Sequence, residues 1–468
     1  MNDFKSQDTD EKEEIELQPL LEEKEGNKVD KKDNLEESFG CISSVVFIVI
    51  LSLFTGLYSV MSLGLFMYQK DELGLKPKTI QMITGIVDIP WLSKPIFGYF
   101  MDVSIRKIKK TKYFIMVMAV IKLIILLVIS FCNVGLGLLI FLMFVFQVTA
   151  CLESIISEYL LVLLSQEYNK GSDKTHNELP VYYIFRSIGM LIGSFSGGRI
   201  IKKYDNQTAF QIASILPVLT FIVAILFKEK PRANSDVHYG SFTQEITKIL
   251  QICKIDKVSN LIAFAMLINS APDFSALVTF YLTDKLKFST DELANLETFA
   301  TLCYIIGLVI YYQLLTNTPP RKFFFVANFI AWLIGLSFLL IVLDVYQSLG
   351  WNPKHFCYVS GGMSSFMAEL QIMPILTIWI TLIPKNLEAV SISLITSLQN
   401  LSGISSEYTG AFFMWILNIE NENYDKLWIL VLIQNFYFLF ILIILLFVDL
   451  PEPKPKTKND NPRPNELD

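Results

Sequence analysis

One apolar segment, residues 84–113, carries an acid, a base and two prolines where an uninterrupted apolar helix would be expected. Asp88 and Lys94 are six positions apart, so on a helix they point to different sides and each needs a partner elsewhere. Pro90 and Pro95 lack backbone N–H groups and predict a kink. Ionisable groups inside a membrane span are costly, and they usually mark the path of a solute or an ion. A purely structural kink is the alternative.

Ionisable side chains recur inside other apolar segments, and together with Asp88 and Lys94 they number seven acids and three bases. The set is Asp88, Lys94, Lys122, Glu153, Glu158, Arg186, Asp273, Glu297, Glu369 and Glu407. They cannot all pair one to one, and an unpaired carboxylate in an apolar medium favours its protonated form. Such acids predict a pathway that also carries protons. The alternative is that these residues pair only to tie helices together.

Polar and aromatic residues near this set suggest how a solute would be held. Ser154 and Glu158 share one face of a helix at a spacing of four, whereas Glu153 points elsewhere. Arg186 stays charged and can grip a carboxylate with two parallel hydrogen bonds, so it suits an anion or a neighbouring acid. The indole of Trp91 could stack on a flat heteroaromatic compound.

Other motifs indicate packing rather than chemistry. Gly189, Gly193 and Gly197 are spaced by four, which lets a second helix approach closely. The six cysteines are scattered without a Cys-x-x-Cys, and the three histidines lie apart in predicted loops. There is no Gly-Lys-Ser/Thr phosphate loop, no His-Glu-x-x-His and no Ser/His/Asp constellation. We therefore expect no enzymatic activity, metal, cofactor or nucleic-acid partner.

The chain of 468 residues is 52% hydrophobic with a mean hydropathy of +0.46, and apolar blocks of bilayer-spanning length recur along it. The pattern predicts an all-α membrane protein in contact with the lipid bilayer. Its twelve expected transmembrane helices are 42–67, 79–101, 113–132, 136–164, 179–200, 208–227, 258–282, 293–315, 323–344, 356–384, 388–416 and 427–449.

Polar stretches divide the chain into five regions. The boundaries are 1–38 for an acidic disordered tail, 39–227 for a six-helix half, 228–257 for a central loop, 258–449 for a second six-helix half and 450–468 for a charged tail. The net charge of −6 originates in the first region, whose own net charge is −8. Weak similarity between the fifth and eleventh helices supports two related halves.

Lysine and arginine in the loops set the expected orientation. They are more numerous in the loops on the N-terminal side, which predicts that both termini are cytoplasmic. In the first tail, Glu16, Leu20 and Leu21 fit an acidic dileucine sorting signal that an adaptor would read. The expected location is the plasma membrane or an endosomal or vacuolar membrane.

The Pro90-Trp91-x-x-Lys94-Pro95-x-x-Gly98 motif resembles the folate–biopterin transporters, a family of the major facilitator superfamily. Stretches at 68–75, 186–198, 270–283 and 388–410 are similar to other parts of that family. Gly98-x-x-x-Asp102 followed by Arg106 and Lys107 looks like the superfamily's loop between helices 2 and 3, which implies a conformational gating role. The resemblance implies the major facilitator fold, with two pseudo-symmetric halves of six helices, and a symporter that moves folates or pterins with protons.

The resemblance has one departure, and two alternatives remain open. Family members often have Asp-x-x-x-Asp in helix 4, where this chain has Ser154 and Glu158. If the solute is a pterin, a carboxylate could receive its amino-pyrimidinone edge. If it is a folate, Lys94, Lys122 or Arg186 could meet its carboxylates. The alternatives are a major facilitator carrier of another organic anion or small solute, and a membrane receptor or scaffold that transports nothing.

Overall fold

The computed structural model describes residues 44–108, 110–168, 179–229, 247, 251, 254, 256–315, 318–382, 388–419 and 424–450. Within them all regular secondary structure is helical. The predicted tails up to residue 38 and from residue 451, most of the predicted central loop and the predicted sorting signal lie outside the described residues. The side chains of Asp102, Arg106 and Lys107 do as well.

Seven helical segments of the described chain are long and apolar enough to cross a bilayer. In chain order they are Ser44–Glu72 (including η1, Tyr58–Met61, α2, Ser62–Met67, and η2, Tyr68–Glu72), α6 (Lys112–Phe131), α7 (Leu136–Tyr168), α9 with α10 (Asn206–Ala213 and Ile215–Leu226), α14 (Thr290–Ile310, continued by η3, Tyr311–Leu315), α15 (Pro320–Val342) and α19 (Leu427–Phe447). At 1.5 Å per residue, each spans the roughly 30 Å of a hydrocarbon core.

Five further segments complete the twelve that the sequence predicts, and they are the more polar or broken ones. Three are long helices: α8 (Leu179–Lys203), α17 (Pro353–Leu382) and α18 (Glu388–Ile416). Two are interrupted: α3 (Pro77–Val87), α4 (Ile89–Leu92) and α5 (Lys94–Ile108) form one, and α12 (Asp256–Asn269) and α13 (Ser275–Asp284) form the other. Helices that line an interior rather than lipid can carry such polar groups and breaks.

The break between α3 and α5 follows from its prolines. Tight turns replace the helical ladder where the amide of Trp91 donates to the Asp88 carbonyl and that of Ser93 to the Pro90 carbonyl. Pro90 itself cannot donate, so the helix loses its regular bond there. The predicted kink is confirmed, as two interruptions at Asp88 and Ser93.

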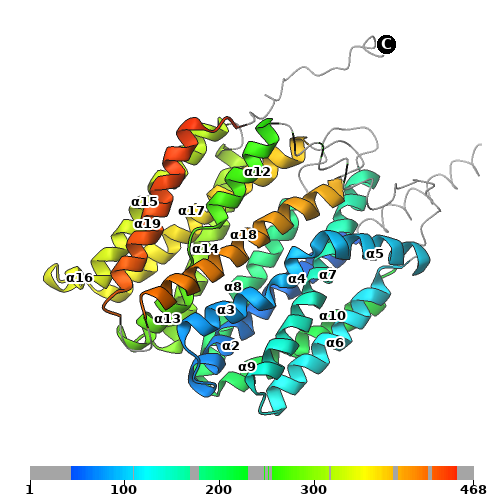
Figure 1. The fold of residues 1–468 in the computed structure, drawn as a ribbon. Coiled ribbons are helices and arrows are strands. Elements are labelled where there is room, and N and C mark those ends of the chain that lie inside the picture. The colour runs from blue at the N-terminus through cyan, green and yellow to red at the C-terminus, as the bar shows by residue number, and fades with distance from the viewer. Residues whose placement is uncertain are drawn as a thin grey trace, which may run out of the picture.

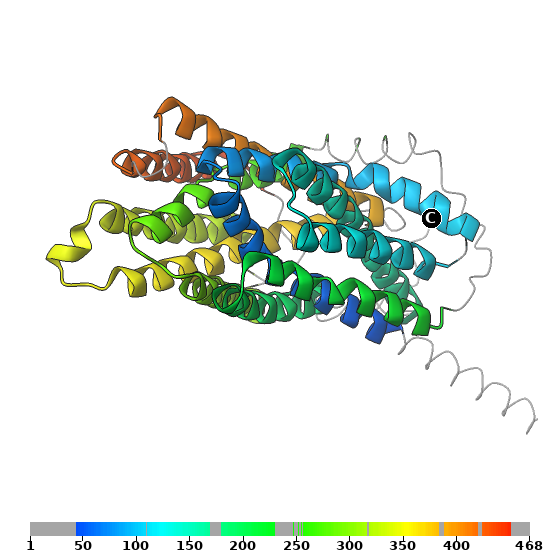
Figure 2. The same ribbon diagram turned by 90° about the horizontal axis from the view of Figure 1, so that it is seen from below.

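The two sets of six segments lie side by side as two halves. Figure 1 shows α3 and α18 next to each other across the middle of the molecule, where the halves meet. A second seam joins α8 to α14. The turned view of Figure 2 shows the short α16 (Val345–Ser348) projecting beyond the other helices. This arrangement is the predicted major facilitator fold.

The bundle has two ends with different contacts. At one end, which we call the Glu229 end, Glu229 accepts hydrogen bonds from the backbone amides of Thr111 and Lys112 at 3.0 and 3.2 Å. At the opposite end, which we call the Lys70 end, the Lys70 ammonium lies 2.5 Å from an Asp284 oxygen. Lys70 belongs to the first half and Asp284 to the second, so this ion pair joins the halves.

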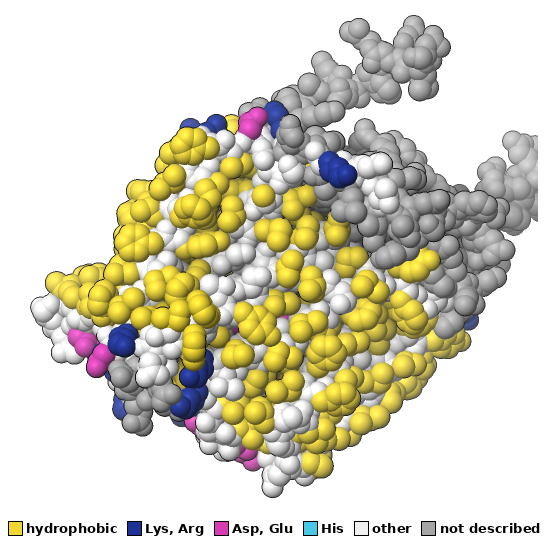
Figure 3. Space-filling view, in the orientation of Figure 1, with side chains coloured by type: hydrophobic (Ala, Val, Ile, Leu, Met, Phe, Trp, Pro, Cys, Tyr) yellow, Lys and Arg dark blue, Asp and Glu magenta, His cyan; other side chains and the backbone are white. Residues whose placement is uncertain are grey.

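The outside of the bundle is apolar between these ends. Figure 3 shows one face covered by hydrophobic side chains, with charged side chains gathered near the ends. Large residues such as Phe447, Leu226 and Phe131 are mostly exposed, at 83%, 72% and 71% of their surface. A soluble protein rarely exposes so much contiguous apolar surface, whereas a lipid-facing belt requires it.

The three glycines of α8 pack against the first helix. A Cβ added at Gly189 would collide with the Leu53 carbonyl, and one added at Gly197 would collide with the Val60 carbonyl. Gly193 is likewise pressed against Leu57 and Ser59. On the first helix, Gly56 meets the Arg186 carbonyl in the same way. Two backbones in van der Waals contact hold the first half together here.

Candidate functional site

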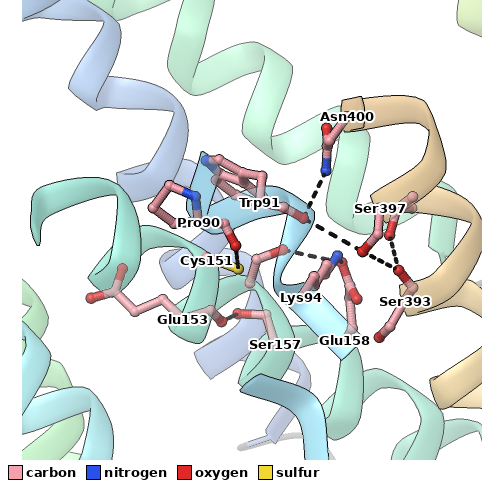
Figure 4. A network of polar contacts seen from close by, with 12 residues as sticks. Pro90, Trp91, Lys94, Cys151, Glu153, Ser157, Glu158, Ser393, Ser397 and Asn400 are labelled. Atoms are coloured by element: carbon pink, nitrogen blue, oxygen red, sulfur yellow. Dashed lines mark hydrogen bonds and ion pairs between the residues drawn. The ribbon is translucent and has the colours of Figure 1, made fainter. Parts of the chain in front are cut away.

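Lys94 and Glu158 form a buried ion pair between α5 and α7. The Lys94 ammonium lies 2.6 Å from the nearer Glu158 oxygen, and the lysine side chain is only 3% exposed. The Ser154 hydroxyl donates to the same carboxylate at 3.1 Å, from one helical turn before it. Figure 4 shows Lys94 and Glu158 pointing toward each other beside α18. A charge-assisted bond in a site with little water is strong, and each partner depends on the other.

The backbone next to this ion pair contacts the other half of the protein. The Trp91 carbonyl accepts hydrogen bonds from Asn400 at 3.3 Å and from Ser397 at 3.5 Å, both on α18. Gly98 lies farther along α5, facing Ser393 of α18. Because Pro95 cannot donate to it, the Trp91 carbonyl is free to bind across the seam. The broken helix thus supplies backbone bonds between the halves.

Lys122 and Glu153 form a second buried pair, between α6 and α7. They are joined by a short hydrogen bond, and Lys122 is 1% exposed. The Lys122 ammonium also lies 4.9 Å and 5.2 Å from the ring centres of Tyr58 and Phe146. These rings belong to a packed apolar cluster inside the first half. The surroundings favour a structural tie rather than a place on a solute pathway.

We expect the single replacement Lys122→Met to cost about 3–5 kcal/mol, because it leaves a buried carboxylate without its partner. The double replacement Lys122→Met with Glu153→Leu should recover most of that loss and keep transport. Thermal unfolding of the purified protein and solute uptake by the same preparations would measure both effects. If the double variant has native stability but no uptake, Lys122 and Glu153 belong to the solute pathway.

Asp88, Asp273 and Glu407 form an acidic group near the seam, and a residue that the sequence did not single out joins two of them. Asp88 accepts a hydrogen bond from Gln147 of α7 at 2.8 Å. The amide nitrogen of Gln81, on α3, donates to Asp273 at 2.7 Å and also to Glu407 of α18. Gln81 was missed because it is uncharged, and only a search for any polar side chain on an apolar helix would have found it.

The break between α12 and α13 is held open by the neighbouring helices. The amide of Asp273 donates to the Ser406 carbonyl at 3.2 Å, and the Ser406 hydroxyl donates to the Ala271 carbonyl. Gln434 of α19 donates to the Pro272 carbonyl at 3.1 Å. Backbone groups released at membrane depth must find partners inside the protein. The broken segment positions Asp273 at the seam.

Arg186 is the cation of the predicted set without an acidic partner in the part of the chain that the structure describes. It lies half-buried on α8, where its charge acts on Tyr182 and Tyr183 of the preceding turn. Glu158, the acid of the neighbouring helix, is instead bound to Lys94. A guanidinium kept without a carboxylate is free to take one from a ligand.

Glu369 is an acid without a base in the described part of the molecule. It lies on α17, is 1% exposed, and neither carboxyl oxygen has a hydrogen-bond partner of good geometry there. The hydroxyl of Tyr304, on α14, lies beside it. Glu297 lies two turns before Tyr304 on α14, next to Ser194 of α8. Glu297 and Glu369 thus lie along the α14 seam.

The residues predicted to gate the conformation lie on a helix rather than in a loop. The backbone of Asp102, Arg106 and Lys107 continues α5, which ends at Ile108. The predicted set is therefore divided among four places. Lys122 and Glu153 pair inside the first half. Trp91, Lys94 and Glu158 lie beside α18, and Asp88, Asp273 and Glu407 lie around Gln81. Arg186, Glu297 and Glu369 follow α8, α14 and α17.

A family model described as the BT1 family matches residues 55–463. The chain belongs to the BT1 family, the folate–biopterin transporters. It is 25% identical to Folate transporter 1 of Plasmodium falciparum (isolate 3D7) over 86% of this chain and 78% of that one. It is 24% identical to the Folate-biopterin transporter of Synechocystis sp. (strain ATCC 27184 / PCC 6803 / Kazusa) over 83% and 78%.

Solved structures agree on the fold of this BT1-family protein. The crystal structure of the nucleoside transporter NupG superimposes with a TM-score of 0.65, covering 86% of this chain and 98% of that one at 13% identity. At that identity the similarity shows the fold alone. The protein is an integral membrane transporter, as its family and its major facilitator fold show. It is not an enzyme.

Proposed function

We propose that this protein is a secondary active transporter that moves folate- or pterin-type compounds across a membrane by alternating access, together with protons. The names of its relatives support the solute class. The observation that supports an anionic solute is Arg186, a guanidinium within the helical bundle with no acidic partner in the described chain. A folate brings the carboxylates that this group lacks, and a bidentate pair would also orient it.

Glu369 supports the proton part of the proposal. Burying an ionised carboxylate without a cation beside it is costly, so this site favours a carboxyl group that can hold a proton. When α17 moves relative to α14, water or a solute can reach the carboxyl group and the proton can leave. The solute path proposed here comprises Asp88, Trp91, Lys94, Glu158, Arg186, Asp273, Glu369 and Glu407, without Lys122 and Glu153.

Contacts between the halves support alternating access. Among the described residues, two ion pairs join the halves at the Lys70 end, Lys70 with Asp284 and Lys202 with Asp291 at 2.9 Å. The solute can enter from that end only after both have broken. We further propose that both termini are cytoplasmic, so that the Lys70 end faces away from the cytoplasm. The membrane is the plasma membrane or an endosomal or vacuolar one, with an adaptor at the tail as a further proposal.

Uptake of radiolabelled folic acid by proteoliposomes tests the proposal, with and without an inward proton gradient. We expect uptake above protein-free liposomes, stimulated by the gradient and reduced by excess folic acid or biopterin but not by unrelated anions. Uptake that does not respond to the proton gradient would exclude proton coupling from the proposal. Competition by unrelated anions alone would favour a different organic anion. Deleting residues 1–38 should leave transport intact, whereas a scaffold that acts through this tail would lose its function.

A further inference from the structure

The carboxamide of Gln81 uses all of its hydrogen-bonding groups across the seam between the halves. Its nitrogen donates to Asp273 at 2.7 Å and to Glu407, and its oxygen accepts from the amide of Ala276 at 3.3 Å. The side chain is 1% exposed. A primary amide has two N–H donors and one oxygen, so each donor serves one carboxylate. All three partners belong to the second half, while Gln81 belongs to the first.

Close packing fixes this bridge in place. The ring of Tyr408, next to Glu407 on α18, packs against Gly85, which lies one turn after Gln81 on α3. Gly410 brings α18 so near the broken segment that a Cβ there would collide with the Asp273 carbonyl. Ser275 gives Asp273 two further hydrogen bonds, at 3.1 and 2.7 Å. The two carboxylates therefore cannot move apart while the halves are joined.

The charges around the bridge do not balance without a proton. The charged groups that act on Glu407 are Asp273 from the α12–α13 break and Asp88 from the end of α3, and both are acids. Lys70, at the end of the bundle toward which α3 begins, is bound to Asp284. Tyr408 is the titratable neighbour on α18. Two carboxylates that share one neutral nitrogen in a low-dielectric site cannot both be ionised at low cost.

We propose that Gln81 joins the two halves only while the Asp273–Glu407 pair holds one proton. The proposal rests on the alternating access proposed above and names the group that ties it to protons. Loss of the proton leaves two carboxylates facing one amide, so the bridge opens and water solvates both. Return of a proton to either carboxyl group allows the amide to bind both again, and the seam closes.

The distance between the halves at the Lys70 end tests this, without any solute. Spin labels are attached at Asp71→Cys and Ser348→Cys, in a chain whose six native cysteines are replaced. Double electron–electron resonance in liposomes then measures the distance between them. Across a pH range of about 5 to 9, we expect the native bridge to give a short distance at low pH and a longer one at high pH. Glu407→Gln, which needs no proton, should stay short throughout.

The replacement Gln81→Leu should shift the midpoint of this transition to lower pH by about one to two units, because the closed state loses hydrogen bonds to a charged group. Gln147→Leu is the matched control, since Gln147 also donates to an acid, Asp88, but within one half. It should leave the midpoint unchanged. The same midpoint in Gln81→Leu and Gln147→Leu, or an unaltered transition in Glu407→Gln, would overturn the proposal.

These outcomes are separate from those of the uptake experiment. A pH-independent distance together with proton-stimulated uptake would refute the role of Gln81 and leave the proposed function standing. A pH-dependent distance without folate uptake would support the bridge and refute the proposed solute.

Discussion

Replacing Arg186 by alanine should reduce folate uptake to the level of protein-free liposomes while the protein stays folded in the membrane. The guanidinium has no acidic partner in the described chain, so its removal leaves no buried carboxylate unpaired. What is lost is the group proposed to bind the solute. A hydrogen bond to a charged partner is worth about 1.5–3 kcal/mol, so affinity should fall roughly tenfold to a hundredfold even before orientation is considered.

The controls for this replacement lie on the same helix. Arg186→Lys keeps the charge but not the planar fork, so we expect weak uptake with a raised KM. Arg199→Ala removes an exposed arginine of α8 that donates to the Phe195 carbonyl of its own helix, and uptake should be unchanged. Native uptake by Arg186→Ala would exclude Arg186 from the site, and the anion would then have to meet Lys94.

Breaking the Lys94–Glu158 pair should abolish uptake and also weaken the fold. Either Lys94→Ala or Glu158→Ala leaves a buried charge without its partner, at a cost of about 3–5 kcal/mol. The pair also lies beside Trp91, whose carbonyl is bound to α18 of the other half. Melting of the purified protein and uptake by proteoliposomes would separate the two effects.

The double replacement Lys94→Met with Glu158→Leu distinguishes a structural pair from a functional one. It should restore most of the stability, because no buried charge remains, yet uptake should stay absent. The corresponding double variant of Lys122 and Glu153 is the matched comparison, and there we expect uptake to survive. If the Lys94–Glu158 double variant transports folate normally, this pair only ties α5 to α7.

The fold could be predicted from the sequence because lipid imposes a simple rule on it. A helix must stay apolar over roughly 20 residues to cross a bilayer, so each span can be recognised from its own stretch of sequence. The kink at Asp88 was equally local, since Pro90 and Pro95 act on their own backbone. Helix ends were less accurate. The second span was expected to end at residue 101, but α5 continues to Ile108 because nothing in that basic stretch prevents a helix.

The partners of the site residues could not be predicted, because they depend on how distant helices face one another. Lys94 binds Glu158, 64 positions away, whereas Arg186 lies closer to Glu158 in sequence and does not bind it. The spacing of five between Glu153 and Glu158 did indicate that the two acids have different neighbours. The bridging role of Gln81 could not be predicted at all, since the sequence does not show that two acids lie beside this neutral amide.

The glycine contacts between α8 and the first helix help to distinguish variants that lower the amount of protein from variants that impair transport. Gly189 and Arg186 are three positions apart on one helix, yet changes at the two should produce opposite defects. A side chain at Gly189 or Gly56 would push two backbones apart, so such a variant would be cleared before it reached its membrane. A variant at Arg186 would arrive in normal amounts and fail to transport. Protein abundance at the membrane therefore distinguishes the two classes of variant without any assay of transport.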